Sequence, residues 1–494
     1  MKSDKGIVDL LVIGGGTAGI VGATTAAALG ASTVLVERDR TGGDCLWTGC
    51  IPSKAILAAA KRAKLAQELI GGIPEQEMTG DMPGLTRNRN HQSGFAAARE
   101  HVRSAISIIE PVDSPAALEK AGVNVRKGSA KFIAPGVAEI DGETIAFRQA
   151  LIASGAEPAS PPIPGLAEAT TVTSETIWEL EEAPARLLVV GGGPVACELA
   201  QAFARFGSKV TVLARSQMLP KEDRDAAAVV RQSMEADGVQ FFENSPVERF
   251  SATDGVSRAG LADGSQHDGD VVLIAAGRRP RTEGLGLETV GVDCDDTGHV
   301  IADVKMRSSN PAIWAAGDVT ANPQFTHLAG VSASAAAFNA ILGLGRSVST
   351  VVPRVTYTAP EIAAVGITSA GQGRYRVSTI QHRELDRAIT EGTPDGLTRL
   401  IIGKGGRIVG GTIVGPRAGE SLAELTIAVE KGLSTRELAG VTHPYPTYND
   451  GVWNAAIADA RSMLASPAAK TVLKVLVRAR RWLLDRRQGR KTDS

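Results

Sequence analysis

The stretch VDLLVIGGGTAG, residues 8–19, indicates where the first folded element begins. Its first half is a short apolar run of the kind that forms a buried strand. The glycines that follow have the spacing GxGxxG and are Gly14, Gly16 and Gly19. An alanine-rich segment and a second apolar run, residues 32–37, come next, and that run ends in Glu37. This order predicts a strand, a glycine turn, a helix and a strand, which form a βαβ unit of an α/β fold.

The spacing of the glycines also indicates what the turn binds. The first glycine of such a unit permits a tight turn, the second lets the backbone approach a pyrophosphate, and the third lets helix and strand pack closely. Glu37 lies 18 positions after Gly19 and can accept hydrogen bonds from a ribose. We therefore predict a dinucleotide site rather than an unrelated glycine-rich turn.

A second unit of the same kind begins at residues 187–190, the run LLVV. Its loop carries Gly191, Gly193 and Ala196 in the GxGxxA variant of the spacing. The next strand, residues 209–213, is followed by Ala214 and Arg215 rather than by an acid. An acid there would hold a ribose 2′-hydroxyl, whereas an arginine favours a 2′-phosphate. This loop therefore predicts NADPH in preference to NADH, the alternative being that Arg215 is only a solvated surface residue.

A close cysteine pair follows the first unit, in GGDCLWTGCIPSK at residues 42–54. Four cysteines in 494 residues do not make a disulfide scaffold. Cys45 and Cys50 could be a redox pair, half of a zinc site or a structural staple. Zinc needs four ligands, and neither Cys197 nor Cys294 has a cysteine or histidine at clip spacing. The redox pair is the favoured interpretation, and no metal site is predicted.

Taken together, these motifs resemble the class I flavoprotein disulfide reductases, the group of dihydrolipoamide dehydrogenase, glutathione reductase and mercuric reductase. The resemblance runs from residue 7 to about residue 462. Four further stretches carry it: LIASGAEP (151–158), LIAAGRRP (273–280), IWAAGDV (313–319) and PRVTYTAPEIAAVGIT (353–368). It implies two Rossmann-like dinucleotide-binding domains, one for FAD and one for NAD(P)H, a C-terminal α/β dimerisation domain, and a homodimer.

The domain boundaries that this resemblance implies divide the chain into five segments. They are residues 1–158 (first part of the FAD-binding domain), 159–280 (NAD(P)H-binding domain), 281–350 (second, central part of the FAD-binding domain), 351–465 (dimerisation domain) and 466–494 (a basic amphipathic tail).

The resemblance also implies roles for individual residues. Cys45 is expected to exchange with the acceptor, and Cys50 to face the flavin as the charge-transfer thiol. Lys54 is expected beside the flavin N5, ion-paired to Glu198. Further FAD contacts are expected at Gly14, Gly16, Gly19, Glu37, Ala130, Ser154, Gly155 and Asp318. NADPH contacts are expected at Gly191, Gly193, Ala196, Arg215 and Gly277.

One part of the family pattern is missing near the C-terminus. Disulfide-reducing members of the family carry a histidine here, contributed to the site by the partner subunit, which acts as the proton shuttle, and a glutamate that orients it. In THPYPTYND, Tyr445 and Asp450 occupy those places. A tyrosine is a poor proton shuttle at neutral pH. His443, two positions earlier, is expected to point the same way as Tyr445 in a strand-like segment and is the alternative base. Mercuric reductases also carry tyrosine here, but they have a C-terminal cysteine pair, and the last cysteine of this chain is Cys294.

The acceptor is therefore open at this stage. We expect a small molecule, either a thiol or disulfide or a metal ion. The alternatives are a quinone or diaphorase-type reductase, a dihydrolipoamide dehydrogenase, and a non-catalytic flavoprotein subunit.

Charge is distributed unevenly along the chain. The net charge is −1, which gives no reason to expect nucleic acid as a partner, yet the residues from 466 onward hold nine lysines and arginines against two aspartates. Residues 468–487 have a helical period with a basic and an apolar face, which suits peripheral contact with a membrane. Docking on the protein's own acidic surface, or a disordered tail, are the alternatives. With no apolar run of 18 residues and no convincing signal peptide, we expect a cytoplasmic protein that the tail could attach to a membrane.

Overall fold

The computed structural model describes residues 6–71, 87–371 and 373–487. The chain forms two compact units. The first unit consists of Met1–Lys221, Arg231–Val352 and Thr356–Thr358, and the second of Glu222–Val230, Pro353–Val355 and Ala359–Ser494. We describe each unit by itself.

The first unit contains a sheet that begins with the strand predicted at residues 8–13. Its order is β3 (Val123–Lys127), β2 (Thr33–Glu37), β1 (Ile7–Ile13), β6 (Glu143–Ile152), β5 (Val137–Ile140) and β4 (Ala130–Ala134), with β17 (Ile313–Ala315) beside β6. The strands β2 and β6 run parallel to β1, and β17 runs parallel to β6. Residues near 315 therefore complete a sheet that the first 152 residues begin.

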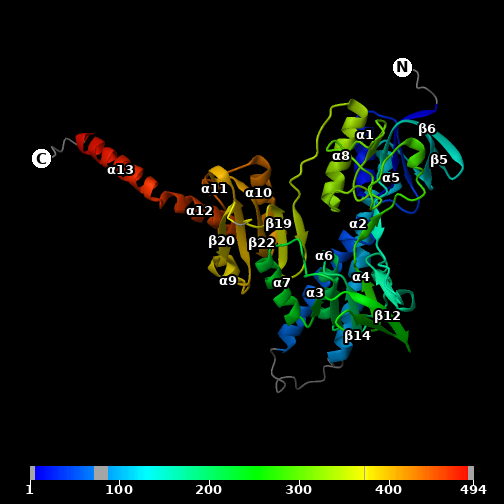
Figure 1. The fold of residues 1–494 in the computed structure, drawn as a ribbon, viewed down its shortest axis with the longest axis horizontal. Helices are drawn as coiled ribbons and strands as arrows, with labels where there is room; N and C mark the ends of the chain where they lie inside the picture. Colours follow the sequence, from blue (N-terminus) through cyan, green and yellow to red (C-terminus); the bar gives the residue numbers. More distant parts are fainter. Residues whose placement is uncertain (1–5, 72–86, 372, 488–494) are drawn as a thin grey trace. The chain divides into compact units, whose positions relative to one another are not determined.

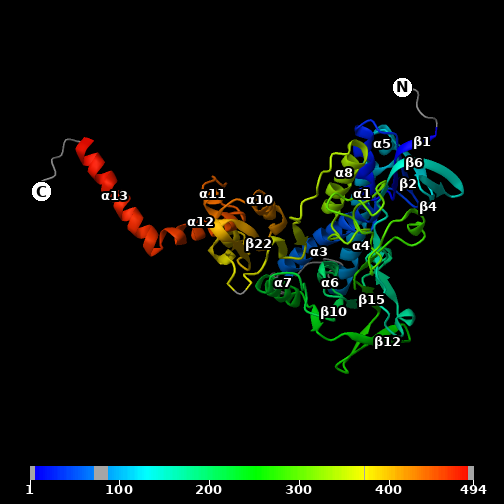
Figure 2. The ribbon, with the colours of Figure 1, turned by 45° about the horizontal axis from the view of Figure 1, so that its top comes forward.

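Alternation along β1 explains how this sheet is covered. Leu10 and Val12 pack with alanines of α1 (Thr17–Ala28) and α8 (Thr326–Leu342), which lie side by side over one face (Figures 1 and 2). Leu11 and Ile13 point to the other face, where they pack with Phe132. Both faces are thus apolar, as expected for the parallel part of an α/β sheet.

A second, parallel sheet in the first unit follows the second glycine motif. Its order is β11 (Gln240–Glu243), β10 (Lys209–Ala214), β9 (Arg186–Val190), β15 (Val271–Ile274) and β8 (Thr171–Thr173). The helix α6 (Pro194–Arg205) follows β9, and α7 (Arg224–Ala236) precedes β11. An antiparallel sheet of β12 (Val247–Thr253), β13 (Val256–Leu261) and β14 (Gln266–Gly269) lies between β11 and β15 in the sequence.

Two features link the parts of the first unit. The short strands β7 (Ala156–Pro158) and β16 (Arg278–Pro280) pair antiparallel, so the chain enters and leaves the second sheet side by side. The helices α2 (Gly43–Trp47), α3 (Cys50–Gly71), α4 (Arg87–Asp113) and α5 (Pro115–Lys120) follow β2, and α3 packs against α4 and α6. Phe95 of α4 holds this packing, with its ring 5.5 Å from those of Phe203 and Phe206.

The second unit is a mostly antiparallel sheet covered by helices. Its order is β18 (Arg354–Thr356), β19 (Glu361–Gly366), β22 (Ile408–Gly415), β21 (Leu397–Ile402) and β20 (Arg376–Gln381). The helix α10 (Ala418–Lys431) packs on β19 and β22, and α12 (Asp450–Leu464) packs on β20 and β21. The remaining helices are α9 (Asp386–Thr390), α11 (Thr435–Ala439) and α13 (Pro467–Arg487).

The predicted α/β class with two Rossmann-like units is confirmed, because each glycine motif opens a parallel βαβ arrangement. None of the helices in the described ranges has the length and apolar character needed to cross a bilayer.

Candidate redox site and nucleotide-binding loops

The two cysteines of the motif lie close to the ends of four helices. Cys45 is on α2, and Cys50 is the first residue of α3. Their side chains share a hydrogen bond, and both are free thiols. Cys50 Sγ lies 3.2 Å from the hydroxyl of Thr326, the first residue of α8, and Cys45 has a further hydrogen bond with Thr17, the first residue of α1. Residues 276 positions apart in the sequence thus meet at the thiols.

The surroundings make the two thiols unequal. The hydrogen bond from Cys45, together with Thr326 and the charge of Lys54, lowers the pKa of Cys50 to about 6, against the opposing effects of burial and of Glu198. The hydrogen bond with Cys50 and the burial of the side chain raise the pKa of Cys45 well above its ordinary value. A thiolate at the N-terminus of α3 also gains from the helix dipole. These directions favour Cys50 as the thiolate of the reduced pair, with Cys45 as the thiol that donates to it.

A charged pair lies one turn further along α3. Lys54 Nζ is 2.9 Å from Glu198 Oε2, which links α3 to α6. The other oxygen, Glu198 Oε1, accepts a hydrogen bond of 2.9 Å from the backbone N–H of Tyr357, and Lys54 Nζ lies 4.3 Å from the centre of the Tyr357 ring. Glu198 is buried, so it depends on these partners.

The first glycine loop has the shape that a pyrophosphate requires. Gly14 has a φ of 106°, and a Cβ there would lie 2.3 Å from the carbonyl oxygen of Ala153. A Cβ on Gly19 would lie 1.7 Å from the carbonyl oxygen of Gly14, which explains why helix α1 can approach the turn so closely. Gly16 is the N-cap residue of α1 and has no side chain that could cap the helix, so backbone N–H groups at this helix start are available to an anion. The loop therefore fits a bound dinucleotide.

The other residues expected at FAD gather at the carboxyl ends of the same strands. Ser154 and Gly155 follow β6, and Asp318 follows its parallel neighbour β17. Glu37, at the end of β2, accepts hydrogen bonds from the N–H groups of Gly15 (2.6 Å) and Asp39 (2.8 Å). Burial raises the pKa of Asp318 above its ordinary value, against the opposing charge of Arg278. A polar partner at the desolvated Asp318 carboxyl would relieve that cost.

Ala130, on β4, joins this edge from a different direction. Gly128, two residues before it, donates a 2.9 Å hydrogen bond to the carbonyl oxygen of Glu37. Ala130 itself is buried and stands opposite Ile140. It is thus close along the chain to the end of β2, where the ribose side of a dinucleotide is expected.

The second glycine loop repeats the geometry of the first. Gly191 has a φ of 135°, and a Cβ there would lie 2.3 Å from the carbonyl oxygen of Ala275. Gly193 is the N-cap of α6, and a Cβ built on it would meet no other atom within 4 Å. Ala196, in the first turn of the helix, is fully buried.

Arg215 and Gly277 follow the strands β10 and β15, at the same edge of the second sheet. Arg215 is exposed. The acid nearest in the sheet, Glu243, is engaged by the N–H of Met218 (2.6 Å) and by Arg231 (2.5 Å). The loop after β10 thus presents a cation to solvent while Glu243 has protein partners.

The segment that carries Tyr445, Asp450 and His443 lies in the second unit, and the three side chains have different surroundings. The Tyr445 side chain is 70 % exposed and donates its hydroxyl to Asp386, and this carboxylate raises the pKa of Tyr445. Asp450 is buried at the start of α12, where it accepts a 3.0 Å hydrogen bond from the N–H of Thr447. Tyr445 and Asp450 therefore each have a separate partner.

His443 does not share the environment of Tyr445, contrary to the expectation that both point the same way. Its side chain is only 5 % exposed, with Nε2 2.6 Å from Glu424 and Nδ1 3.0 Å from the carbonyl oxygen of Val441. The ring stacks on Trp453 at a centroid distance of 5.2 Å. The segment is not a strand, so the alternation that underlay the expectation does not apply.

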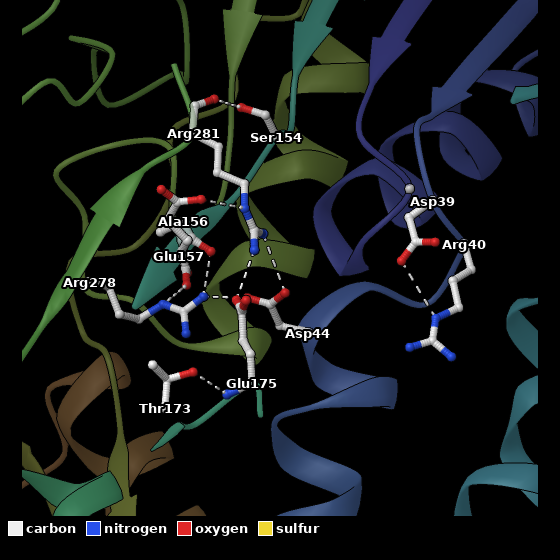
Figure 3. A network of polar contacts seen from close by, with 12 residues as sticks. Asp39, Arg40, Asp44, Ser154, Ala156, Glu157, Thr173, Glu175, Arg278 and Arg281 are labelled. Carbon is white, nitrogen blue, oxygen red and sulfur yellow. Dashed lines mark hydrogen bonds and ion pairs between the residues drawn. The ribbon is translucent and has the colours of Figure 1, made fainter. Parts of the chain in front are cut away.

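Several residues at the site could not be predicted from the sequence. Thr17 and Thr326 reach the cysteines from helices that begin elsewhere in the chain. Asp44 stands next to Cys45 and contacts Arg278 and Arg281 (Figure 3). Asp44 lies inside the cysteine motif and Arg278 inside LIAAGRRP, but nothing in either stretch indicates that the two meet.

Comparison with known proteins agrees with this geometry. Residues 8–333 match the family model of the pyridine nucleotide-disulphide oxidoreductases, and residues 352–456 match that of their dimerisation domain. A mercuric reductase of Streptomyces lividans is 35 % identical over 465 residues, which cover 91 % of this chain and 95 % of that protein. A dihydrolipoyl dehydrogenase of Thermus scotoductus is 35 % identical over 462 residues, covering 91 % and 96 %.

A solved structure is similar over the same extent. The Cu(II) complex of the HOCl-induced flavoprotein disulfide reductase RclA from Escherichia coli has a TM-score of 0.80 at 25 % identity, covering 92 % of this chain and 99 % of that one. Enzymes of this family use FAD and NAD(P)H, for which the two glycine loops described above have the required form. The chain therefore belongs to the pyridine nucleotide-disulphide oxidoreductases and carries their dimerisation domain.

Proposed function

We propose that this enzyme passes two electrons from NADPH to a Cys45–Cys50 disulfide and from there to a small acceptor that binds thiolates. The observation that carries this proposal is the inequality of the two thiols, with the pKa of Cys50 lowered to about 6 and that of Cys45 raised. FAD, when bound, supplies the two-electron relay between nicotinamide and sulfur. Gly14, Glu37 and Asp318 are the residues proposed to hold it.

Reduction of the pair can be written with its protons. The disulfide takes up two electrons and one proton, its S–S bond breaks, and Cys45 becomes a thiol while Cys50 becomes a thiolate. The neighbours of the pair favour this division, since Thr326 and the cation of Lys54 stabilise the anion on Cys50. Cys45, which holds the proton, is the sulfur left to meet an acceptor.

The Lys54–Glu198 pair is proposed to place a fixed positive charge beside the cofactor. Glu198 holds Lys54 at 2.9 Å and is itself held by the N–H of Tyr357. A preorganised charge of this kind stabilises negative charge that develops during electron transfer, without any reorganisation at the moment of reaction.

A soft metal ion is the acceptor class that the second unit favours. With Tyr445 hydrogen-bonded to Asp386 and His443 packed between Glu424 and Trp453, neither side chain has the form of a free base. A dithiol or disulfide acceptor needs a proton relay at each turnover, whereas a metal ion bound by thiolates does not. The overall reaction is NADPH with one Hg(II) giving NADP⁺, a proton and Hg(0), or with two Cu(II) giving two Cu(I).

A low-molecular-weight disulfide is the alternative acceptor. Reduced enzyme, the disulfide RSSR and one proton would give two RSH and the oxidised cysteine pair. In a homodimer, which the dimerisation domain supports, Tyr445 of one subunit is proposed to face the cysteines of the other. A tyrosine in this place would suit a metal ion, which requires binding more than proton transfer, better than a disulfide.

The test compares acceptors with matched cysteine variants. Steady-state NADPH oxidation is measured with Hg(II), Cu(II), a glutathione-type disulfide, lipoamide and a quinone, using wild type, Cys45→Ser and Cys294→Ser. We expect metal reduction to exceed disulfide and lipoamide reduction, to vanish in Cys45→Ser and to persist in Cys294→Ser, because Cys294 is exposed and outside the site. Metal reduction that survives Cys45→Ser would contradict the proposal.

A quinone reductase at a membrane surface is the second candidate, and α13 is the observation that favours it. The helix presents eight exposed apolar side chains: Val472, Leu473, Val475, Leu476, Val477, Trp482, Leu483 and Leu484. It also carries seven cations: Lys470, Lys474, Arg478, Arg480, Arg481, Arg486 and Arg487, against the single acid Asp485. A helix of this composition binds anionic lipid headgroups through its cations while its apolar side chains enter the interface.

Vesicle sedimentation tests this second candidate. Full-length enzyme and a variant that ends at Ser466 are mixed with vesicles of phosphatidylglycerol or of phosphatidylcholine. Binding to the anionic vesicles alone, lost in the truncated variant and at high salt, supports membrane contact. Equal sedimentation of both variants, or cysteine-independent quinone reduction that does not depend on the tail, would contradict it.

A further inference from the structure

A polar cluster next to the redox pair has no part in the roles assigned so far. Asp44, the residue before Cys45, contacts two guanidinium groups (Figure 3). Its Oδ2 is hydrogen-bonded to Arg278, and its Oδ1 lies 3.4 Å from Nη1 of Arg281. Arg281 Nη2 lies 2.8 Å from Glu175 Oε1. Arg281 Nε also lies 3.6 Å from Glu157 Oε2. Both oxygens of Asp44 are thus held, and Arg281 contacts three carboxylates.

The members of the cluster come from segments that flank the second sheet. Arg278 begins β16, Arg281 directly follows it, and Glu175 follows β8. Trp178, three residues beyond Glu175, donates its indole N–H to the carbonyl oxygen of Thr48 at 2.9 Å. The segment that carries Cys45 is therefore attached at Asp44 and at Thr48 to the chain around the second sheet.

Arg278 extends this attachment to the FAD side. Its Nε lies 3.6 Å from Asp318 Oδ2, and its Nη2 donates to the carbonyl oxygen of Ala156 at 2.6 Å. Asp44 and Asp318 consequently share one guanidinium. The position of the Asp44 turn is thereby linked to the carboxylate proposed to hold the cofactor.

The cluster is partly shielded from water, so its carboxylates depend on Arg281 as a cationic partner. The side chains of Asp44, Glu175, Arg278 and Arg281 are between 21 and 33 % exposed. Burial, and the charge of Asp44 as a further cause, raise the pKa of Glu175 although Arg281 opposes this. Without Arg281, two shielded carboxylates would lie close together with Arg278 as the remaining cation at Asp44, and the turn would lose one of its anchors.

We propose that Arg281 is a positioning residue for the redox pair, acting through Asp44 to fix the turn that carries Cys45. The proposal rests on the proposed function of Cys45 as the exchanging thiol. Arg281 touches neither thiol, so its effect on them must pass through the Asp44 carboxylate and the backbone of α2. Loss of this anchor would leave Cys45 less well held against Cys50, which slows its exchange with an acceptor and exposes it to other reagents.

The experiment compares Arg281→Gln with Arg279→Gln in the reduced holoenzyme. Arg279 is the matched control, since it lies on the same strand β16 but pairs at 2.5 Å with Glu157 and is 66 % exposed. The first readout is the rate at which iodoacetamide alkylates Cys45, measured by mass spectrometry of the peptide, with the exposed Cys294 as internal standard. The second readout compares the effect of each variant on the rate of flavin reduction by NADPH with its effect on the rate of acceptor turnover.

For Arg281→Gln we expect roughly tenfold faster alkylation of Cys45 and roughly tenfold slower acceptor turnover, with the rate of flavin reduction unchanged. Arg281→Lys, which keeps the charge, should recover part of the loss. The double variant Asp44→Asn/Arg281→Gln should be no worse than Asp44→Asn alone, because Arg281 acts through Asp44.

Alkylation of Cys45 in Arg281→Gln at the rate of Arg279→Gln would overturn the proposal, as would additive effects of Asp44→Asn and Arg281→Gln. If Arg281→Gln does not fold, the same comparison is made with Arg281→Lys. Failure of the proposed function is seen separately, as turnover that survives Cys45→Ser, because the alkylation readout does not depend on turnover.

Discussion

The redox loop of the first unit and the 443–450 segment of the second unit differ in how their chemical groups are held. Around the cysteines, Lys54 lies on the same helix as Cys50, whereas Thr326 and Glu198 come from distant parts of the sequence. In the 443–450 segment the polar side chains have partners within the second unit, Glu424 for His443 and Asp386 for Tyr445. The cysteine site thus has the unequal thiols that the proposed electron transfer requires, whereas neither His443 nor Tyr445 has the form of a free base.

The largest effect that would sharpen this comparison is expected from the charged pair at α3. Glu198→Gln keeps the size of the side chain but leaves Lys54 without its carboxylate partner at 2.9 Å. We expect the rate of flavin reduction by NADPH, followed in a stopped-flow instrument, to fall roughly a hundredfold. The control is Glu143→Gln, whose exposed carboxylate pairs with Arg126. A flavin reduction rate for Glu198→Gln within twofold of wild type would show that this pair does not contribute to electron transfer.

A smaller effect is expected at the second glycine loop. Arg215 is exposed after β10, where a 2′-phosphate is proposed to bind. Arg215→Glu should lower kcat/KM for NADPH roughly tenfold or more and leave that for NADH within a few-fold, because the new carboxylate repels the phosphate and can accept from a ribose hydroxyl. Steady-state kinetics with both nucleotides measures this. Equal losses of kcat/KM for both nucleotides would mean that Arg215 does not bind the 2′-phosphate.

The redox loop also predicts a pH dependence. Since the pKa of Cys50 is lowered to about 6, its thiolate and the charge-transfer absorption that the thiolate produces should appear as the pH rises through about 6 and be absent at lower pH. Thr326→Val removes a hydrogen bond that lowers this pKa, so the midpoint should move upward. A pH titration of the reduced enzyme measures both midpoints. An unchanged midpoint in Thr326→Val would show that the hydroxyl has no influence on the thiolate.

The smallest effect is expected from the second unit. Tyr445→Phe removes the hydroxyl that donates a hydrogen bond to Asp386. It should change metal-ion turnover by less than about threefold, because reduction of a metal ion requires no proton relay. Tyr445→His should raise turnover of a disulfide severalfold and leave metal turnover nearly unchanged. A large loss of metal turnover in Tyr445→Phe would break the comparison, since the 443–450 segment would then contain a group essential to the reaction.

Much of the fold followed from local patterns in the sequence. The predicted strands at residues 8–13 and 187–190 correspond to β1 (Ile7–Ile13) and β9 (Arg186–Val190). The glycines of both loops identified close approaches that the structure contains, such as the one between Gly14 and Ala153. Such features are predictable because a turn and the strand before it are adjacent in the chain.

The features that sequence reasoning missed depend on contacts across long distances in the chain. Asp44 and Arg278 are 234 positions apart, and nothing near either residue indicates the other. His443 was expected to point with Tyr445 because alternation was assumed, but the segment is not a strand and Trp453 covers the ring. Lys54 and Glu198 could be paired in advance only through a family resemblance, since their spacing of 144 residues has no local meaning.

The most direct test of the central claim is an anaerobic NADPH titration of wild type, Cys45→Ser and Cys50→Ser, followed by absorption at several pH values. We predict a charge-transfer band in wild type with a midpoint near pH 6, a band that persists in Cys45→Ser and no band in Cys50→Ser. A band that survives in Cys50→Ser, or its absence from wild type at pH 8, would contradict the assignment of Cys50 as the thiolate that faces the cofactor.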